Sequence, residues 1–432
     1  MIAALWGFAA VLLFSFIGLP LAFVTLIVGL VGFAWLRGWN WSGALATTGQ
    51  QVMEAAANYG LSVIPLFLLM GIFIHRSHVS EDLFRAAYAA VGARRGGLAQ
   101  ASVLACAGFS AVSGSSLATA ATMTRVAMPH MRRYGYDDRL SSGVVAAGGT
   151  LGIMIPPSVP LILYGLVAEQ DIGKLFVAGM IPGVLLIAVY MGAVWLTVMR
   201  NPEIGPAGEP LSRAEKISAF LRVWPILLMF GIVLGGIYFG IFTPTEAAGI
   251  GAGGAGIFAL LRGGIRSFGD LSGMLIEATR TTAILFAVIF GTLVFANFIN
   301  LSGLPYDLLD LTETLGLGSM GLVLAICVIC VLLGMIFETI GLLLLIVPVF
   351  LPALYGMGVD LIWFGIVMVV VIELGLITPP IGMNVFTVKS VMPDIALGRI
   401  FRGVMPFVLA DLVALALILI FPVIAVGLVG LM

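Results

Sequence analysis

The sequence predicts an all-α polytopic membrane protein made of two inverted-topology repeats. Three observations support this prediction. The 432 residues are 61% hydrophobic and 9% charged, with a mean hydropathy of +1.18, whereas soluble domains carry about 25% charged residues. One apolar motif occurs twice, at residues 151–157 and 374–380. The cationic residues gather in clusters between long apolar segments, as expected for loops on one side of a membrane.

The duplicated motif places a double proline inside a strongly apolar segment. It is Leu-Gly-Ile-Met-Ile-Pro-Pro at 151–157 and Leu-Gly-Leu-Ile-Thr-Pro-Pro at 374–380. Proline lacks a backbone donor and clashes with the preceding turn, so we expect each helix to break there. A broken backbone is tolerated at membrane depth only where protein or a water-filled cavity satisfies it. Matched breaks in two halves therefore indicate a transport site.

The repeats have predicted bounds of 1–200 and 224–432, joined by a linker at 201–223. The linker is polar and contains three X-Pro steps, which is typical of a solvent-exposed segment. We expect it in the cytoplasm. A constant offset between the repeats aligns four pairs of identical residues, namely Glu54 with Glu277, Pro129 with Pro352, Gly152 with Gly375, and Asp171 with Asp394.

Each repeat is predicted to contain scaffold spans, an amphipathic arm, a re-entrant hairpin and a broken helix. The first repeat has spans at 2–18, 20–36, 55–75 and 175–199, an arm at 78–93, a hairpin at 97–130 and a broken helix at 140–168. The second has an arm at 304–316, a hairpin at 318–356 and a broken helix at 361–388. Five full crossings per half are an odd number, so the repeats must be inverted. Both termini are then periplasmic or extracellular.

An alternative topology makes each hairpin two full spans. About 35 residues are available, and a bilayer requires about 20 for each span, so a hairpin that turns part-way is favoured. If the cationic clusters lie in the cytoplasm, Arg37 and Lys174 are the only cationic residues on the other side of the membrane, in agreement with the positive-inside rule.

Charge and cysteine content argue against two other classes of function. The net charge is −1, so the chain lacks the basic surface that nucleic-acid binding requires. Cys327 and Cys330 lack further metal ligands, which favours helix packing.

The hairpin tips are the first candidate sites. One tip comprises residues 113–119, rich in glycine, serine and threonine, and the aligned tip comprises 336–342. We expect each tip to meet the double-proline break of its own repeat. Carbonyl groups at the ends of half-helices can coordinate a monovalent cation, and half-helix N-termini can hold an anionic group. The competing interpretation is close helix packing by small residues.

Carboxylates within apolar segments are the second class of candidates. Glu338 lies at the second tip, Glu373 precedes the second motif, and Asp411 lies in the last span. Intramembrane carboxylates indicate function by default, although interhelical hydrogen bonds also employ them. Glu246 follows Thr243-Pro244-Thr245, where a structural role at a helix start is favoured. Ser158 and Asn384 follow the two proline pairs, and each could face a substrate.

The chain resembles the large membrane subunit of tripartite ATP-independent periplasmic (TRAP) transporters, the DctM family. The matching segments cover essentially the whole chain and include residues 114–116, 149–158, 242–248 and 377–384. The resemblance implies an elevator-type ion-transporter fold, in which a transport domain holding both hairpins moves against a fixed scaffold. It implies sodium-driven uptake of a small organic acid, such as a C4-dicarboxylate or sialic acid, across the bacterial inner membrane. No enzymatic activity and no organic cofactor are implied, and Na⁺ is the coupling ion.

Two kinds of protein partner follow from the resemblance: a small four-helix membrane subunit, expected as a separate chain, and a periplasmic substrate-binding protein. The resemblance also implies two sodium sites and a substrate site. Carried over position by position, the first sodium site involves Ser115, Ser116, Gly152 and Pro156, the second involves Glu338, Thr339, Gly375 and Thr378, and the substrate contacts are Ser115, Ser158 and Asn384. The second tip departs from the first, because Phe-Glu-Thr replaces Gly-Ser-Ser, so the symmetry of the two ion sites is approximate.

Two other functions remain open from the sequence. A stand-alone sodium- or proton-coupled carboxylate transporter would need no binding protein, and Glu338 and Glu373 are compatible with proton coupling. An intramembrane serine hydrolase would use Ser115 or Ser116, but it requires a positioned base, and the three histidines His75, His78 and His130 flank loops.

Overall fold

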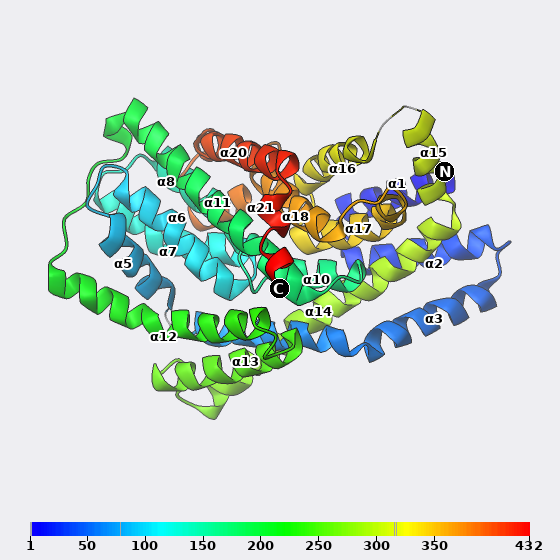
Figure 1. The fold of residues 1–432 in the computed structure, drawn as a ribbon, viewed down its shortest axis with the longest axis horizontal. Coiled ribbons are helices and arrows are strands. Elements are labelled where there is room, and N and C mark those ends of the chain that lie inside the picture. The colour runs from blue at the N-terminus through cyan, green and yellow to red at the C-terminus, as the bar shows by residue number, and fades with distance from the viewer. Residues whose placement is uncertain (1, 78, 315, 317) are drawn as a thin grey trace.

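The computed structural model describes residues 2–77, 79–314, 316 and 318–432 (Figure 1). His78 lies outside these residues. Every regular element in the described ranges is a helix, and the only β-type pairing there is an isolated bridge between Arg95 and Ala207. The predicted all-α class is therefore confirmed.

The first half of the chain contains eleven α-helices within the described residues. Their bounds are α1 (Ile2–Phe16), α2 (Leu21–Leu36), α3 (Trp41–Ala57), α4 (Val63–His75), α5 (Val79–Val91), α6 (Gly97–Ser113), α7 (Ser116–Arg133), α8 (Asp138–Gly148), α9 (Leu151–Met154), α10 (Val159–Val167) and α11 (Ile172–Arg200).

The second half contains ten α-helices in the described part of the chain. They are α12 (Arg213–Tyr238), α13 (Pro244–Leu261), α14 (Phe268–Leu301), α15 (Leu304–Thr314), α16 (Ser319–Gly334), α17 (Thr339–Gly356), α18 (Leu361–Ile377), α19 (Met383–Val391), α20 (Leu397–Ile420) and α21 (Val423–Val426).

Several of these helices are long and apolar enough to cross a bilayer. Among the described residues, α11, α12, α14, α17 and α20 qualify individually. Two bent pairs also qualify as broken spans: α3 with the segment containing α4, bent by 57°, and α8–α9 with α10, bent by 42°. This length and composition match a polytopic membrane protein.

Two segments differ from the sequence-based expectation. The helix α3 was not expected, because its residues include Thr47, Gln50, Gln51 and Glu54 and are less apolar than a typical span. The helix α12 begins at Arg213, so the second part of the expected linker is helical. A capping box explains this start, since the Ser212 hydroxyl accepts from Glu215 N–H, and the Glu215 carboxylate accepts from Ser212 N–H.

The helices form two groups, which we call the frame (α1–α4 and α12–α14) and the bundle (α6–α11 and α16–α21). In the frame, α2 packs along α14 and α4 along α13. Small residues permit this close approach: a Cβ atom at Gly29 would lie 2.6 Å from the Phe295 backbone nitrogen. In Figure 1, α12, α13 and α3 lie along the lower edge, α16 and α20 lie along the upper edge, and α11 runs diagonally from the upper left into the middle.

Two short helices connect the groups. The helix α5 packs against α6 of the bundle and α12 of the frame, and α15 contacts α17 of the bundle and α14 of the frame. Their positions correspond to the arms expected from the sequence. Each arm therefore touches both groups at once.

Both halves of the chain contribute to the bundle and interlock at one end. The Arg132 guanidinium bonds the Asp138 carboxylate at 2.7 Å and the Asp394 carboxylate at 2.5 Å. The hydrogen bond from Arg132 holds the pKa of Asp394 below its usual value. Nearby, Arg399 pairs with Asp137 at 3.2 Å. These ion pairs tie the first hairpin and α8 to the loop and helix after the second break.

The start of α13 has the structural role expected for Glu246. The Thr243 hydroxyl accepts a hydrogen bond from Glu246 N–H at 3.3 Å, and the Glu246 carboxylate accepts one from Thr243 N–H at 2.8 Å. Pro244 occupies the first helical turn, where no intrahelical donor is required. The predicted structural role of Glu246 at a helix start is confirmed, and the structure adds that its carboxylate takes part in a capping box.

Candidate functional site

Both double prolines interrupt a helix. The helix α9 ends at Met154, and α10 begins after Ser158, with Pro156 and Pro157 in the gap. The helix α18 ends at Ile377, and α19 begins after Gly382, with residues 378–382 in the gap. Gly382 has a φ of +60°, a left-handed conformation that glycine adopts without steric cost. The two breaks differ in exposure, because the first proline pair is buried and the second is exposed.

The first hairpin tip packs against the first break. The turn between α6 and α7 passes through Gly114, whose φ is +60°. A Cβ atom at Gly114 would lie 3.2 Å from Val159 Cγ2, just beyond the break. One helical turn before Gly114, Ser110 of α6 packs against Gly152 of α9. A Cβ atom at Gly152 would lie 2.0 Å from Ser110 Cβ, so only glycine permits the two helices to come this close.

The second tip meets the second break in a similar way. A Cβ atom at Gly375 would lie 2.8 Å from Gly334 Cα, so the two helix backbones are in direct contact. The Gly382 N–H donates to the Met335 carbonyl at 3.2 Å, which joins the break to the hairpin turn. The contact that the sequence predicts between each tip and the break of its own half is therefore present in both halves.

The residues assigned to the first sodium site gather at this first contact. Ser115 is exposed and is the N-cap of α7, and its hydroxyl accepts from Ala118 N–H at 3.4 Å. Ser116, Gly152 and Pro156 are buried. The residues predicted for this site therefore offer one accessible hydroxyl and backbone groups at a turn and a helix break.

The residues assigned to the second sodium site lie at the second contact. Glu338 is the exposed N-cap of α17 and makes no capping hydrogen bond through its side chain. The neighbouring Thr339 hydroxyl is buried and has no hydrogen-bond partner among the described residues. Gly375 is buried, and the Thr378 hydroxyl donates to the Leu374 carbonyl at 2.5 Å. A buried hydroxyl without a partner, next to the carboxylate of Glu338 in the sequence, is compatible with a cation ligand set.

Of the three residues predicted to contact substrate, Ser115 is exposed, whereas Ser158 and Asn384 are fully buried in this conformation. The Ser158 hydroxyl donates to the Ile153 carbonyl across the break and accepts from Leu161 N–H at 3.3 Å, so it caps α10. The Asn384 amide donates to the Ala146 carbonyl at 3.0 Å, while its oxygen has no partner within the described part of the chain.

Asn384 also connects the two halves of the site. A Cβ atom at Gly149 would lie 3.1 Å from both the Asn384 amide nitrogen and the Ser116 carbonyl oxygen. A residue after the second break therefore lies beside the first hairpin tip. Sequence reasoning did not identify Gly149, Ala146 or Ser110 as site residues, although the Gly148-Gly149 pair before the motif was a signal for close backbone approach.

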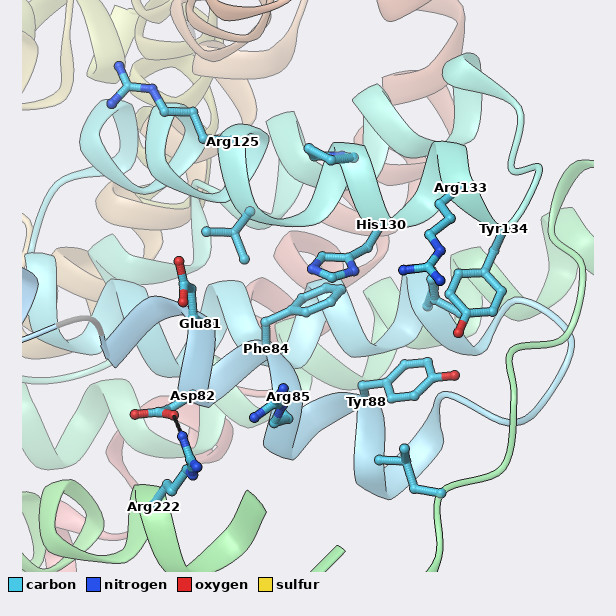
Figure 2. A pocket seen from close by; sticks show the side chains of 14 residues that line it. Glu81, Asp82, Phe84, Arg85, Tyr88, Arg125, His130, Arg133, Tyr134 and Arg222 are labelled. Carbon is cyan, nitrogen blue, oxygen red and sulfur yellow. Dashed lines mark ion pairs between the residues drawn. The ribbon is translucent and has the colours of Figure 1, made fainter. Parts of the chain in front are cut away.

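A separate cavity of about 530 Å³ lies between α5, α7 and α12 (Figure 2). None of the predicted site residues lines it. Arg222 of α12 approaches the Asp82 carboxylate of α5 at 3.7 Å, and Arg262 pairs with the same carboxylate. The His130 ring of α7 stacks on the Phe84 ring of α5, with centroids 5.3 Å apart. The cavity therefore lies where the first arm, α5, contacts both the hairpin helix α7 and the frame helix α12.

A sequence profile of the tripartite ATP-independent periplasmic transporter, DctM component, matches residues 8–424. The chain belongs to the DctM family. It is 37% identical to the C4-dicarboxylate TRAP transporter large permease protein of Pseudomonas aeruginosa, over 88% of each chain. It is 32% identical to the sialic acid TRAP transporter large permease protein of Vibrio cholerae, over 98% of this chain and 96% of the relative.

Solved structures agree with this DctM-family fold. The YdaH transporter of Alcanivorax borkumensis superposes with a TM-score of 0.66 at 16% identity, covering 89% of both chains. The MtrF structure of Neisseria gonorrhoeae gives 0.60 at 14% identity, covering 87% of this chain and 83% of that one. The chain therefore combines the DctM family sequence with the fold of these two solved transporters.

Proposed function

We propose that this permease takes up a small organic acid, such as a C4-dicarboxylate or sialic acid, in symport with sodium. The observation that carries the proposal is the contact of each hairpin tip with the helix break of its own half. This contact gathers hydroxyls and backbone carbonyls of broken helices, which are hard oxygen ligands suited to Na⁺, at two related places. The relatives named for C4-dicarboxylates and sialic acid support the substrate class.

The two ion sites comprise the residues assigned from the sequence. The first uses Ser115, Ser116, Gly152 and Pro156, and the second uses Glu338, Thr339, Gly375 and Thr378. The unpartnered Thr339 hydroxyl supports the second site. The substrate binds between them near Ser115, Ser158 and Asn384, and the position of Asn384 beside Ser116 supports a single shared pocket.

Transport proceeds by movement of the bundle against the frame, an elevator mechanism. The division of the helices into two groups, each touched by both arms, supports this arrangement. The repeats 1–200 and 224–432 are inverted, the linker at 201–223 is cytoplasmic, and both termini are periplasmic. The cationic clusters support this orientation in the bacterial inner membrane.

Two partners complete the transporter: a small four-helix membrane subunit as a separate chain, and a periplasmic binding protein that delivers the substrate. The outward apolar faces of the frame helices, including Leu227, Phe268 and Ile276, are exposed and suit contact with that subunit or with lipid. One relative carries the name of a fused permease, DctMQ, which supports the close association of the two membrane subunits.

The membrane potential is sufficient for uphill uptake. It supplies about 2.3 kcal/mol per elementary charge per 100 mV. Since about 1.4 kcal/mol corresponds to a tenfold ratio, one net positive charge per cycle supports roughly fortyfold accumulation before the sodium gradient is included.

Reconstitution into proteoliposomes tests the proposal. The permease is combined with its small subunit, and uptake of a radiolabelled organic acid is measured with and without an inward sodium gradient and with and without the binding protein. The account predicts uptake only when both are present. Uptake that continues without sodium, or that is undiminished without the binding protein, contradicts it.

A further inference from the structure

The cavity between α5, α7 and α12 is lined by more cationic than anionic side chains (Figure 2). Its volume of about 530 Å³ suits a small organic molecule rather than a single ion. Its charged lining residues are four arginines and two acids, namely Arg85, Arg125, Arg133 and Arg222, with Glu81 and Asp82. The excess of guanidinium groups over carboxylates makes the cavity a candidate site for an anion.

One of the two carboxylates is already engaged by other arginines. Asp82 is only 8% exposed, and its carboxylate pairs with Arg222 of α12 and with Arg262, which lies just after α13 and does not line the cavity. Asp82 therefore fixes the arm α5 to the frame. It does not neutralise the arginines on α5 and α7.

The other three arginines of the cavity have no partner of their own. The guanidinium groups of Arg85, Arg125 and Arg133 form no hydrogen bond or ion pair with any described residue. Glu215 of α12 lies within electrostatic range of Arg85, but its carboxylate accepts hydrogen bonds from Ser212 N–H at 2.8 Å and from the Ser212 hydroxyl at 2.7 Å. Guanidinium groups that line one cavity repel each other, and an anion between them would relieve this repulsion.

Two of these arginines line the cavity from opposite elements. Arg85 belongs to α5, and Arg133 is the last residue of α7. In Figure 2, Arg133 extends from α7 toward α5, whereas Arg125 points away from α5. Beside Arg133, the Tyr88 hydroxyl donates to the Glu209 carbonyl at 2.8 Å, which fixes the linker to the arm at the edge of the cavity. Arg85 and Arg133 are therefore the two cationic groups best placed to hold one anion.

The cavity lies at the level where α12 enters the membrane. The first turns of this membrane-spanning helix carry Arg213 and Lys216, and its exposed apolar side chains then begin. They are Ile217, Phe220, Leu221, Trp224 and Leu227, each at least 50% exposed. An exposed tryptophan two residues after Arg222 is typical of the boundary between hydrocarbon and lipid headgroups. Arg222 lines the cavity, so the cavity is at headgroup level.

We propose that this cavity binds the headgroup of an anionic phospholipid, with the Arg85 and Arg133 guanidinium groups donating to its phosphate oxygens. A guanidinium group matches a phosphate through two parallel charged hydrogen bonds, and basic pockets between helices at the membrane surface hold such headgroups. Apolar side chains complete the lining and suit the glycerol and the first acyl carbons, namely Phe84, Leu98, Val126, Pro129 and Leu211. No residue proposed for sodium or substrate takes part, so the site does not rest on the proposed function.

Lipid binding to the purified full-length permease tests the site without any transport assay. The protein is delipidated in a neutral detergent and titrated with dioleoyl phosphatidylglycerol, while the Tm and the bound lipid in native mass spectrometry are recorded. The proposal predicts a bound lipid and a rise in Tm. The double variant Arg85→Gln with Arg133→Gln should bind at least about tenfold more weakly, because each charged hydrogen bond corresponds to about that factor.

A matched control separates the cavity from the general attraction of anionic lipid to a basic surface. Arg94 and Arg280 are also exposed but do not line the cavity. The double variant Arg94→Gln with Arg280→Gln has the same net charge as the cavity variant and should keep the wild-type affinity. Equal affinity in the two double variants overturns the proposal.

A second comparison uses the wild type alone and stays decisive if the cavity variant fails to fold. Dioleoyl phosphatidylcholine has the same acyl chains and the same phosphodiester, but its choline cation cancels the negative charge. The proposal predicts a smaller rise in Tm with this lipid than with phosphatidylglycerol. Equal stabilisation by the two lipids overturns it, because the guanidinium groups would then not select the headgroup.

Two soluble anions distinguish a lipid from other sources of negative charge. Inorganic phosphate and succinate are added separately, at millimolar concentration, to the delipidated wild type and to the cavity variant. The proposal predicts that neither anion raises the Tm through Arg85 and Arg133. A phosphate effect that the cavity variant loses, without any effect of phosphatidylglycerol, would assign a soluble phosphate compound and overturn the lipid site. A succinate effect that the variant loses would make the cavity part of the substrate route and also overturn it. Failure of every uptake assay with intact lipid binding would instead contradict the proposed function alone.

Discussion

Replacing Gly152 by alanine is the most direct perturbation of the contact between a hairpin tip and a helix break. The added Cβ would lie 2.0 Å from Ser110 Cβ and 2.7 Å from Ser110 Cα, whereas ordinary contact begins at 3.4 Å. The obstacle includes backbone, so a rotamer change at Ser110 does not relieve it. The hairpin and α9 must separate by more than 1 Å, on the order of the shifts that disrupt a preorganised site.

The expected cost follows from the behaviour of overpacked interiors. Inserting a methyl group into a closely packed contact costs about 1–3 kcal/mol, which corresponds to roughly a 5- to 160-fold change in an equilibrium. We expect Gly152→Ala to weaken sodium-dependent stabilisation by an amount in this range. The assay is the rise in Tm of the purified permease on adding sodium chloride, together with the initial rate of uptake in proteoliposomes.

A second glycine on a bundle helix provides the matched control. Gly192 lies inside α11, and a Cβ atom there would have no neighbour within 4 Å. Gly192→Ala should be neutral or stabilising by up to about 1 kcal/mol, because alanine favours the helix. If Gly152→Ala retains the sodium response and uptake rate of Gly192→Ala, the close contact is not needed for ion binding, and the reasoning is refuted.

Three further predictions concern single contacts. Asn384→Ala removes the hydrogen bond to the buried Ala146 carbonyl and should destabilise the permease by about 1–3 kcal/mol in chemical unfolding; an unchanged midpoint would contradict this. Thr243→Ala removes the cap of α13 and should cost about 0.5–2 kcal/mol, whereas Thr243→Ser should retain most of the stability; equal losses in the two variants would exclude capping as the cause. Arg132 lowers the pKa of Asp394, so this carboxylate stabilises the fold above its unfolded pKa of about 3.9 and loses that effect as pH falls through its lower folded pKa. The stability difference between wild type and Asp394→Asn should therefore be present at neutral pH and shrink below about pH 4, and a difference independent of pH would disprove this coupling.

The elements with strong local signals were predictable from the sequence. A double proline in an apolar segment breaks a helix wherever it occurs, so both breaks were placed correctly. The glycine and serine tip at 113–116 indicated the first turn in the same way. The cap at Thr243 and Glu246 was recognisable because all its atoms lie within one helical turn.

The parts that depend on long-range packing were not predictable. Asn384 reaches Ala146 only because α19 lies against α8, and no local pattern encodes that contact. Likewise, the Tyr190 ring packs against Phe407 only because α11 and α20 are in contact. The helix α3 was not predicted because its residues are polar. Its position depends on the helices around it and not on its own hydropathy.

In the proposed mechanism, substrate and sodium move together through one pocket. This coupling is tested by the influx of radioactive sodium into proteoliposomes that contain the permease and its small subunit. Sodium influx is recorded as binding protein and labelled organic acid are added together. The account predicts that substrate uptake and sodium influx rise in a fixed ratio and that both are lost when the binding protein is omitted. Substrate uptake without a matching sodium influx would contradict it.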